Sequence, residues 1–171
     1  AYDVRVPLTD WRMEMADPER GDIVVFPNPR DGERTIKRVV GLPGDMIEIR
    51  RGVVRINGLA ASYEPMLARD VAHVPLDARS RHAFLWEDLG AGPHPVMREI
   101  AHPGPRRFGP IAIPRDTYFV LGDNRDHSSD SRAFGLVPRH TIRGRARTVV
   151  FSVETRDSLG VRAERIWTDL P

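Results

Sequence analysis

Prolines and glycines interrupt this sequence so often that long helices are excluded. The 171 residues include fifteen prolines and fourteen glycines, and both residue types are unfavourable inside a helix. Between them lie short apolar or alternating runs with the length of β-strands. We expect strands at residues 22–26, 35–40, 46–49, 52–58, 117–121 and 145–153. The predicted fold class is therefore mostly β.

Local punctuation refines this prediction. Arg50, Arg51 and Gly52 lie between two predicted strands and are typical of a tight hairpin turn, which implies antiparallel strands. Residues 130–134 predict one short helical turn. From residue 59 to residue 111 the texture changes, with seven prolines, four of the six histidines and weaker periodicity. We interpret residues 1–58 and 112–171 as a discontinuous antiparallel-sheet core, and residues 59–111 as an inserted smaller β-rich domain.

Composition excludes several classes of function. The net charge is only +2, and no arginine run has interleaved aromatic residues, so nucleic-acid binding is not indicated. The chain has no cysteine, and its histidines lack metal-ligand spacing, so we expect neither a metal nor another cofactor. No stretch approaches the roughly 18 apolar residues that cross a bilayer. The chain starts with Ala-Tyr-Asp, which is consistent with a fragment whose upstream part is missing.

Lys37 is the most informative single residue. All other twenty-five basic residues of the 26 are arginine, and arginine serves wherever only a solvated positive charge is needed. A lysine amine, unlike a guanidinium, can lose its proton once it is buried beside apolar groups. A lone lysine in a mostly apolar stretch therefore suggests a general base. The alternative is that an arginine-rich composition spared one lysine by chance on the wet edge of a strand.

The second informative segment is the polar loop at residues 122–132, which directly follows an apolar strand. Strand ends of this kind present side chains to a functional site. Within the loop, charged residues can neutralise one another, and serine hydroxyls can contact a nearby amine; the charged residues are Asp123, Arg125, Asp126, Asp130 and Arg132. A well-satisfied turn remains an alternative. A calcium loop is a third reading, but the Asp-x-Asp-x-Asp-Gly spacing is missing.

Three segments together resemble the catalytic domain of type I signal peptidase, the bacterial leader peptidase. Residues 20–26 (RGDIVVF) are similar to a strand motif of that family, residues 37–45 (KRVVGLPGD) to its lysine box, and residues 122–132 (GDNRDHSSDSR) to its Gly-Asp-Asn-Arg-Asp box. Order and spacing also match. The resemblance covers residues 2–57 and 113–151, more than half of the chain. His127 stands where asparagine is common.

The resemblance implies a serine endopeptidase with a Ser/Lys dyad that removes signal peptides from exported preproteins. It implies that Lys37 is the general base and that Ser128 orients its amine. Asp130 and Arg132 would form a supporting ion pair, Gly122 and Asp123 would shape the backbone near the lysine, and Ile36 would line the pocket for a small substrate side chain. The implied location is the bacterial cytoplasmic (inner) membrane, with the catalytic domain on the outer, periplasmic side.

The chain departs from the family pattern at the nucleophile. The family's serine lies upstream of the Arg-Gly-Asp strand, in a Ser-Met-x-Pro motif after the membrane anchor, and this motif does not occur here. None of the serines at positions 62, 80, 129, 131, 152 and 158 has matching flanks. We therefore expect a fragment that lacks its anchor and its nucleophile, contacts the membrane only through that missing anchor, and is inactive as it stands.

Two alternatives stay open. One is a catalytically inactive relative, or a peptide-binding module, that keeps the groove but has lost the nucleophile. The other is a self-cleaving repressor-type Ser/Lys domain, which would carry an upstream helix-turn-helix and lack the long insertion. The sequence does not reveal the oligomeric state, the role of residues 59–111 or which preproteins are cleaved.

Overall fold

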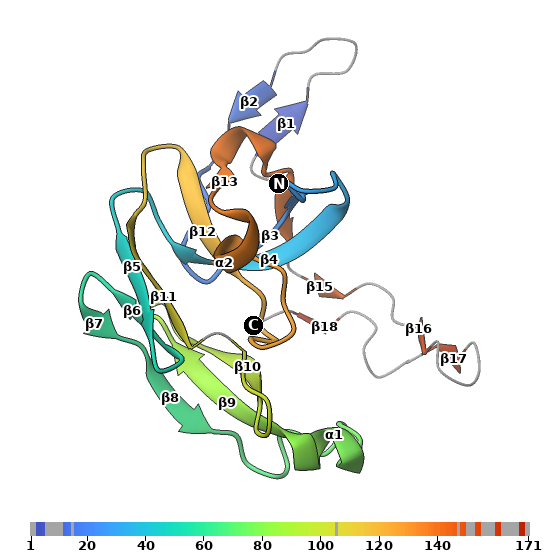
Figure 1. Ribbon diagram of the computed structural model, residues 1–171. Helices are drawn as coiled ribbons and strands as arrows, with labels where there is room; N and C mark the ends of the chain where they lie inside the picture. The colour runs from blue at the N-terminus through green and yellow to red at the C-terminus, as the bar shows by residue number, and fades with distance from the viewer. Residues whose placement is uncertain are drawn as a thin grey trace.

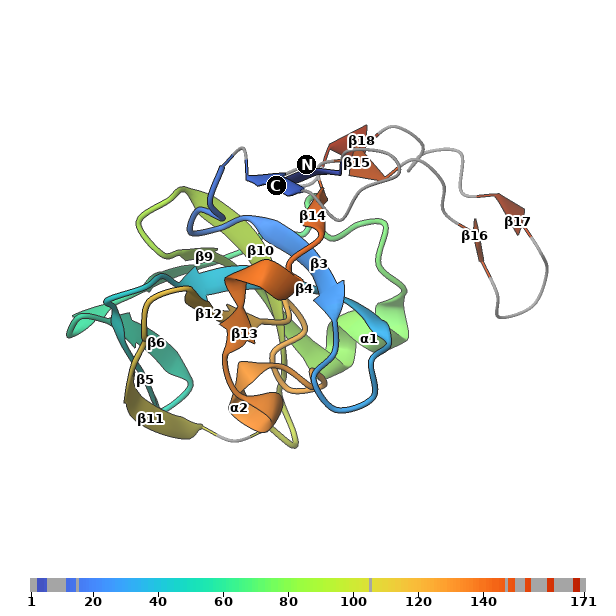
Figure 2. The ribbon, with the colours of Figure 1, turned by 90° about the horizontal axis from the view of Figure 1, so that it is seen from above.

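Antiparallel sheets dominate the computed structural model, which describes residues 3–5, 12–14, 16–104, 106–146, 148–149, 153–154, 160–161 and 168–169. The predicted mostly β class is confirmed. The central sheet has five strands in the order β13-β12-β4-β3-β14, of which Figure 1 labels the first four and Figure 2 labels β14. Its strands are β3 (Ile23–Pro27), β4 (Arg34–Gly41), β12 (Thr117–Leu121), β13 (Val137–Pro138) and β14 (Gly144–Ala146).

A second sheet has four strands in the order β11-β5-β6-β7, which are β5 (Met46–Arg50), β6 (Val53–Ile56), β7 (Leu59–Ala60) and β11 (Arg107–Ala112). The tight turn expected between β5 and β6 is present, because Arg50 pairs with Val53. Arg51 and Gly52 both have positive φ, 51° and 80°, as a two-residue type I′ hairpin requires. Figure 2 shows β5, β6 and β11 grouped beside β4 and β12.

A third sheet has three strands in the order β10-β9-β8, which are β8 (Ser62–Pro65), β9 (His82–Asp88) and β10 (Pro93–Glu99). Helix α1 (Leu76–Arg81) leads directly into β9. This sheet lies inside the segment 59–111 that the sequence marks as an insertion. In contrast, β7 and β11, which fall in the same segment, pair with β6 and β5 of the residues before it. The division into core and insertion remains a prediction.

Short elements complete the described part of the chain. They are the helices α2 (Ser131–Phe134) and η1 (Arg139–Thr141), and the paired strands β1 (Asp3–Arg5) with β2 (Arg12–Glu14), β15 (Thr148–Val149) with β18 (Thr168–Asp169), and β16 (Val153–Glu154) with β17 (Gly160–Val161). The strand predicted at 145–153 corresponds to parts of β14, β15 and β16, and its residues 147 and 150–152 lie outside the described residues. Within the described residues, no helix has the length and apolarity needed to cross a membrane.

The central sheet is buried on both faces, because alternate side chains of its strands enter two different apolar clusters. On β12, Phe119 and Leu121 belong to the first cluster, which also takes in β4, β5 and β6. Tyr118 and Val120 belong to the second cluster, together with Val24, Phe26, Val39, Val137 and Ile142. Each side chain position on β4 and β12 therefore has a defined side, and this fixes where Lys37 lies.

Candidate active site

Lys37 lies on β4 opposite Val24 of β3. Val24 is fully buried in the second cluster, and side chains two apart share a face of the sheet, so Lys37 and Val39 point to the side of that cluster. On the other edge of β4, Arg38 pairs with Leu121, the last residue of β12. Strand β12 ends at Leu121, and the polar loop begins at the next residue, Gly122.

Gly122 is the point at which Lys37 and Ser128 converge. A Cβ atom added at Gly122 would lie 3.6 Å from Lys37 Nζ, 2.2 Å from Ser128 Oγ and 2.6 Å from Ser128 Cβ. Only glycine leaves room for this approach, because real Cβ atoms do not come within 3.0 Å of other heavy atoms. The Ser128 hydroxyl is buried and makes no hydrogen bond to any described residue. The sequence-predicted base and its predicted partner thus both lie within 4 Å of the position that a Gly122 Cβ would occupy.

Asp130 and Arg132 form the ion pair that the sequence led us to expect. Arg132 Nε lies 2.8 Å from Asp130 Oδ1 and Arg132 Nη2 lies 2.7 Å from Asp130 Oδ2, a bidentate geometry. Asp130 is fully buried and also accepts a hydrogen bond from the backbone N–H of Gly122 at 3.1 Å. It caps α2, which confirms the predicted helical turn. Asp130 therefore fixes the helical turn and the amide beside Lys37 together.

The expectation that the loop charges neutralise one another is wrong for three of the five residues. Asp123 pairs with Arg38 of β4, at 2.9 and 3.0 Å. Asp126 accepts backbone N–H groups of Glu99 and Gly104, both at 2.7 Å. The third, Arg125, pairs with Glu87 of β9. The loop packs against neighbouring strands, so these three charged residues bind partners that are distant in the sequence and not other residues of the loop.

The remaining predicted residues are placed as follows. Ile36 is 56% exposed, next in sequence to Lys37 but on the other side of β4. Of the apolar residues considered as a dry wall for the amine, Val39 shares the face of Lys37, whereas Val40 belongs to the first cluster. Phe134 packs against the second cluster, edge-on to Phe26 with ring centroids 6.0 Å apart.

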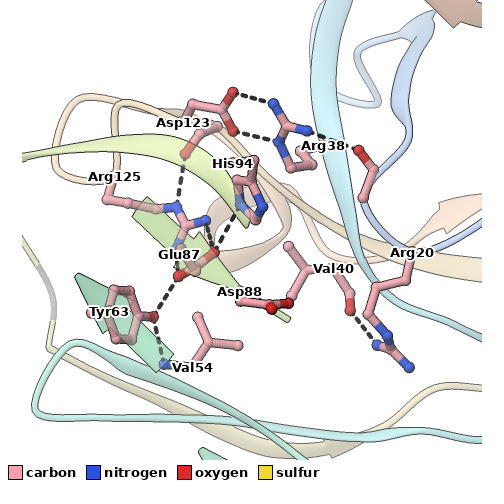
Figure 3. A network of polar contacts seen from close by, with 12 residues as sticks. Arg20, Arg38, Val40, Val54, Tyr63, Glu87, Asp88, His94, Asp123 and Arg125 are labelled. Atoms are coloured by element: carbon pink, nitrogen blue, oxygen red, sulfur yellow. Dashed lines mark hydrogen bonds and ion pairs between the residues drawn. The ribbon is translucent and has the colours of Figure 1, made fainter. Parts of the chain in front are cut away.

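Sequence reasoning missed a buried polar network beside the loop (Figure 3). Glu87 is fully buried and receives Arg125 through both terminal nitrogens, the Tyr63 hydroxyl, and His94 Nε2 at 3.1 Å. The one available signal was a charged residue following the apolar run Phe84, Leu85 and Trp86, which by itself does not distinguish a buried carboxylate from an exposed one.

Charge inside this network is strongly coupled. Burial alone would raise the pKa of the Glu87 carboxyl, but the hydrogen bond with His94 and the charge of Arg125 outweigh it and hold that pKa well below its ordinary range. Burial, followed by the charge of Glu87, raises the pKa of Tyr63 to about 12. Burial would lower the pKa of Arg125, yet the Glu87 carboxylate raises it. The pair is thus ionised at neutral pH.

Among the described residues, no group of three or more histidine, aspartate or glutamate side chains is arranged to hold a metal ion.

The other serines of the chain, which the sequence does not favour as nucleophiles, are placed as follows. Ser131 is buried and its Oγ accepts the backbone N–H of Val120 at 2.9 Å, Ser129 is exposed, and Ser62 and Ser80 lie on β8 and α1. Ser152 and Ser158 lie outside the described residues.

Comparison with known proteins identifies the family of this chain. The family model described as "Signal peptidase, peptidase S26" matches residues 4–151. Signal peptidase I of Pseudomonas fluorescens is 35% identical over 165 residues, covering 89% of this chain and 56% of that protein. Probable signal peptidase I-2 of Synechocystis sp. is 36% identical over 139 residues, covering 77% and 48%. The crystal structure of a signal peptidase I from Enterococcus faecalis has 34% identity and a TM-score of 0.47, covering 77% of this chain and 97% of that one.

The chain thus spans about half the length of the curated relatives it matches, 56% and 48% for these two. The family match nevertheless takes in all three motifs and both sides of the Lys37 site. On that match, the chain belongs to the signal peptidase family, peptidase S26.

Proposed function

We propose that this chain is the catalytic part of a serine endopeptidase that removes signal peptides from exported preproteins, with Lys37 as the general base. The observation that carries the proposal is the approach of Lys37 Nζ and Ser128 Oγ to the same side of Gly122. An amine held beside a hydroxyl at a strand end is an arrangement suited to proton transfer. The relatives named signal peptidase I supply the substrate class.

In the proposed reaction, the uncharged amine of Lys37 takes the proton of a serine hydroxyl as its oxygen attacks the scissile carbonyl carbon. The resulting ammonium gives this proton to the leaving amine, and the signal peptide remains as an ester on the serine. Lys37 then takes a proton from water, which attacks the ester, and returns it to the serine oxygen. Every proton transfer in this reaction passes through Lys37 Nζ. The rate therefore depends on how that nitrogen is positioned relative to the serine oxygen and the substrate.

The neighbours of Lys37 take supporting roles in this proposal. Ser128 orients the amine, since its hydroxyl can both accept and donate. Asp130, paired with Arg132, holds the Gly122 amide, and Asp123, paired with Arg38, holds the start of the loop. The exposed Ile36 next to Lys37 would contact the small side chain that precedes the cleaved bond.

The nucleophile is the part of the proposal that needs residues beyond this sequence. Of the other serines, Ser131 is bonded to the backbone of Val120, Ser62 and Ser80 lie on β8 and α1, and none has the flanks of the family's Ser-Met-x-Pro motif. We therefore assign the attacking hydroxyl to a serine in the part of the enzyme that this chain does not span. The same part would hold the protein at the bacterial inner membrane, with the described domain on the outer side.

The test is cleavage of a preprotein with an Ala-x-Ala site by the enzyme expressed from its full reading frame. We expect Lys37→Arg to lower the cleavage rate by about 10²–10⁴-fold, the usual contribution of a general base, because a guanidinium keeps its proton. Circular dichroism checks the fold of the variant.

Arg115→Lys, the reverse exchange at an exposed position, is the matched control and should cleave like wild type. Retained cleavage by Lys37→Arg would refute the assignment. A folded wild-type enzyme that binds the preprotein without cutting it would favour a peptide-binding relative instead.

A further inference from the structure

Arg125 links the third sheet to the site. Its side chain is 5% exposed, and its guanidinium donates to two different partners. Nη1 donates to Glu87 Oε1 at 2.6 Å and Nη2 donates to Glu87 Oε2, while Nε donates to the backbone oxygen of Gly122 at 3.2 Å. Figure 3 shows the Arg125 guanidinium against the Glu87 carboxylate. One planar group therefore connects a carboxylate on β9 with Gly122, the residue that Lys37 and Ser128 both approach.

Gly122 is held at both of its peptide groups. Asp130 accepts its N–H at 3.1 Å, and Arg125 donates to its C=O at 3.2 Å. Ser128 Oγ packs closely on Gly122, because it lies only 2.2 Å from where a Cβ would be. A shift of the Gly122 carbonyl would therefore change the backbone surface that Ser128 and Lys37 both approach.

The backbone of β10 holds the same loop. Met97 N–H donates to the oxygen of Asp123 and the Arg125 N–H donates to the oxygen of Met97, both at 2.9 Å. These bonds form the isolated parallel bridge between Met97 and Asn124. The side chain of Asp126 then takes the N–H groups of Glu99 and Gly104. The third sheet thus contacts the loop through its backbone as well as through Glu87.

Stability alone does not require a charged pair at the buried positions of Glu87 and Arg125. A fully buried ion pair loses much of its Coulombic gain to desolvation, and apolar residues of similar size often replace such pairs without loss of stability. What apolar residues do not reproduce is the directed N–H of Arg125 at the Gly122 carbonyl. The fixed, charged geometry therefore points to a demand for position at the loop.

We infer that Glu87 and Arg125 are positioning residues for the Lys37 site, so that the β8–β10 sheet is part of the catalytic apparatus. Glu87 fixes Arg125, Arg125 fixes the Gly122 carbonyl, and that carbonyl fixes the spacing of Ser128 and Lys37. Neither residue touches the reacting atoms. This inference rests on the proposed function, because it assumes that Lys37 Nζ is the group to be positioned.

The kinetic test separates position from stability in the full-length enzyme. Glu87→Leu and Arg125→Met each leave a buried charge unpaired and should lower the melting temperature. The double variant removes both charges of the pair and should recover part of it, although Tyr63 and His94 lose their hydrogen bonds to Glu87. We expect the double variant to keep a kcat at least about 10-fold below wild type, with KM changed less than about two-fold, because misplacement of a catalytic group costs rate more than binding.

A double variant that regains both the melting temperature and wild-type kcat would overturn the inference, since the pair would then be purely structural. A raised KM with an unchanged kcat would overturn the inference as well. If the double variant does not fold, Glu87→Gln, which retains the shape of the side chain, is measured in the same way.

A second readout does not depend on cleavage. Lys37 is the sole lysine of the chain, so reductive ¹³C-methylation gives one lysine resonance, with the methylated N-terminal amine as an internal reference. We expect Glu87→Gln to shift or broaden the Lys37 resonance. The matched control is Asp77→Asn, which removes a 65% exposed carboxylate paired with Arg81 and should leave it unchanged.

An unchanged Lys37 resonance in Glu87→Gln would overturn the positioning role even if the enzyme cleaves preproteins. A shifted resonance together with a wild-type enzyme that cleaves nothing would support the structural coupling and refute the proposed function instead. The two failures are therefore distinguishable.

Discussion

Two buried carboxylates hold the loop at residues 122–132 through arginines of that same loop, and they do so differently. Asp130 pairs with Arg132, two residues away, and also accepts backbone N–H groups of Gly122 and Arg132. Glu87 pairs with Arg125, 38 residues away, and its described partners are all side chains. The first pair is a local turn with a charge, and the second is a tie between two sheets.

The difference shows in what remains when an arginine is removed. Without the Arg132 guanidinium, Asp130 keeps two backbone donors, the N–H groups of Gly122 and of residue 132. Without Arg125, the described partners that Glu87 keeps are the side chains of His94 and Tyr63, and none of them is a backbone N–H. We therefore expect loss of the arginine to destabilise the protein less at the Asp130–Arg132 pair than at the Glu87–Arg125 pair.

The largest expected effect breaks the long-range pair. Arg125→Met should lower the free energy of unfolding by about 3–5 kcal/mol, the usual result of stranding a buried charge. Arg132→Met should cost less, about 1–3 kcal/mol, because the backbone donors to Asp130 remain. Urea-induced unfolding followed by circular dichroism measures both variants. An equal or larger loss in Arg132→Met would mean that the two pairs are equivalent.

The next effect tests the residue on which both pairs act. Gly122→Ala places a Cβ 2.2 Å from Ser128 Oγ, so Ser128 must move away from Lys37. We expect cleavage by the full-length enzyme to fall about 100-fold, the scale of a misplacement of roughly 1 Å. Gly144→Ala is the control, since a Cβ at Gly144 meets nothing within 4 Å. Comparable activity in the two variants would show that the close approach has no bearing on catalysis.

The local sequence pattern was sufficient to predict most strands of the two larger sheets. The predictions for residues 22–26, 35–40, 46–49 and 117–121 match β3, β4, β5 and β12 within one residue at each end, and the predicted run at 52–58 contains the shorter β6. The hairpin turn and the α2 turn also follow from residue types that favour one backbone geometry. The Asp130–Arg132 pair was implied by the family resemblance, and both of its partners lie in one turn.

Partners that lie far apart in sequence were not predictable in this way. Asp123 pairs with Arg38, which is 85 residues away in the sequence. Strand β5 pairs with β11, although all three strands of the third sheet lie between them in the sequence. A side chain chooses such partners by packing, and no local pattern records which strand will lie beside which. Lys37 was found because it is unique in composition, whereas Glu87 is one acid among 24 acidic residues. The catalytic roles of the site residues remain predictions.

The smallest effect sharpens the comparison through pH. Tyr63→Phe removes the hydroxyl that contacts Glu87 and should cost about 1.5–3 kcal/mol at pH 8, the range for a hydrogen bond to a charged group. Because burial and the charge of Glu87 raise the pKa of Tyr63 from 10.0 to about 12, the neutral phenol is favoured in the folded state. Its contribution is fully present below pH 10 and is lost as the pH rises through about 12.

The difference in unfolding free energy between wild type and Tyr63→Phe should therefore narrow between pH 10 and pH 12. Glu87 titrates in the opposite direction. Its lowered pKa means that the stability it contributes is present above its ordinary pKa of 4.5 and declines as the pH falls below that value. Tyr63→Phe should keep that acid decline, whereas Glu87→Gln should lose it. Urea midpoints at pH 3, 8, 10 and about 11.5 separate the two. A Tyr63→Phe difference that stays constant up to the highest pH would mean that the hydroxyl and the Glu87 carboxylate are not coupled, and that the long-range tie consists of Arg125 and His94 alone.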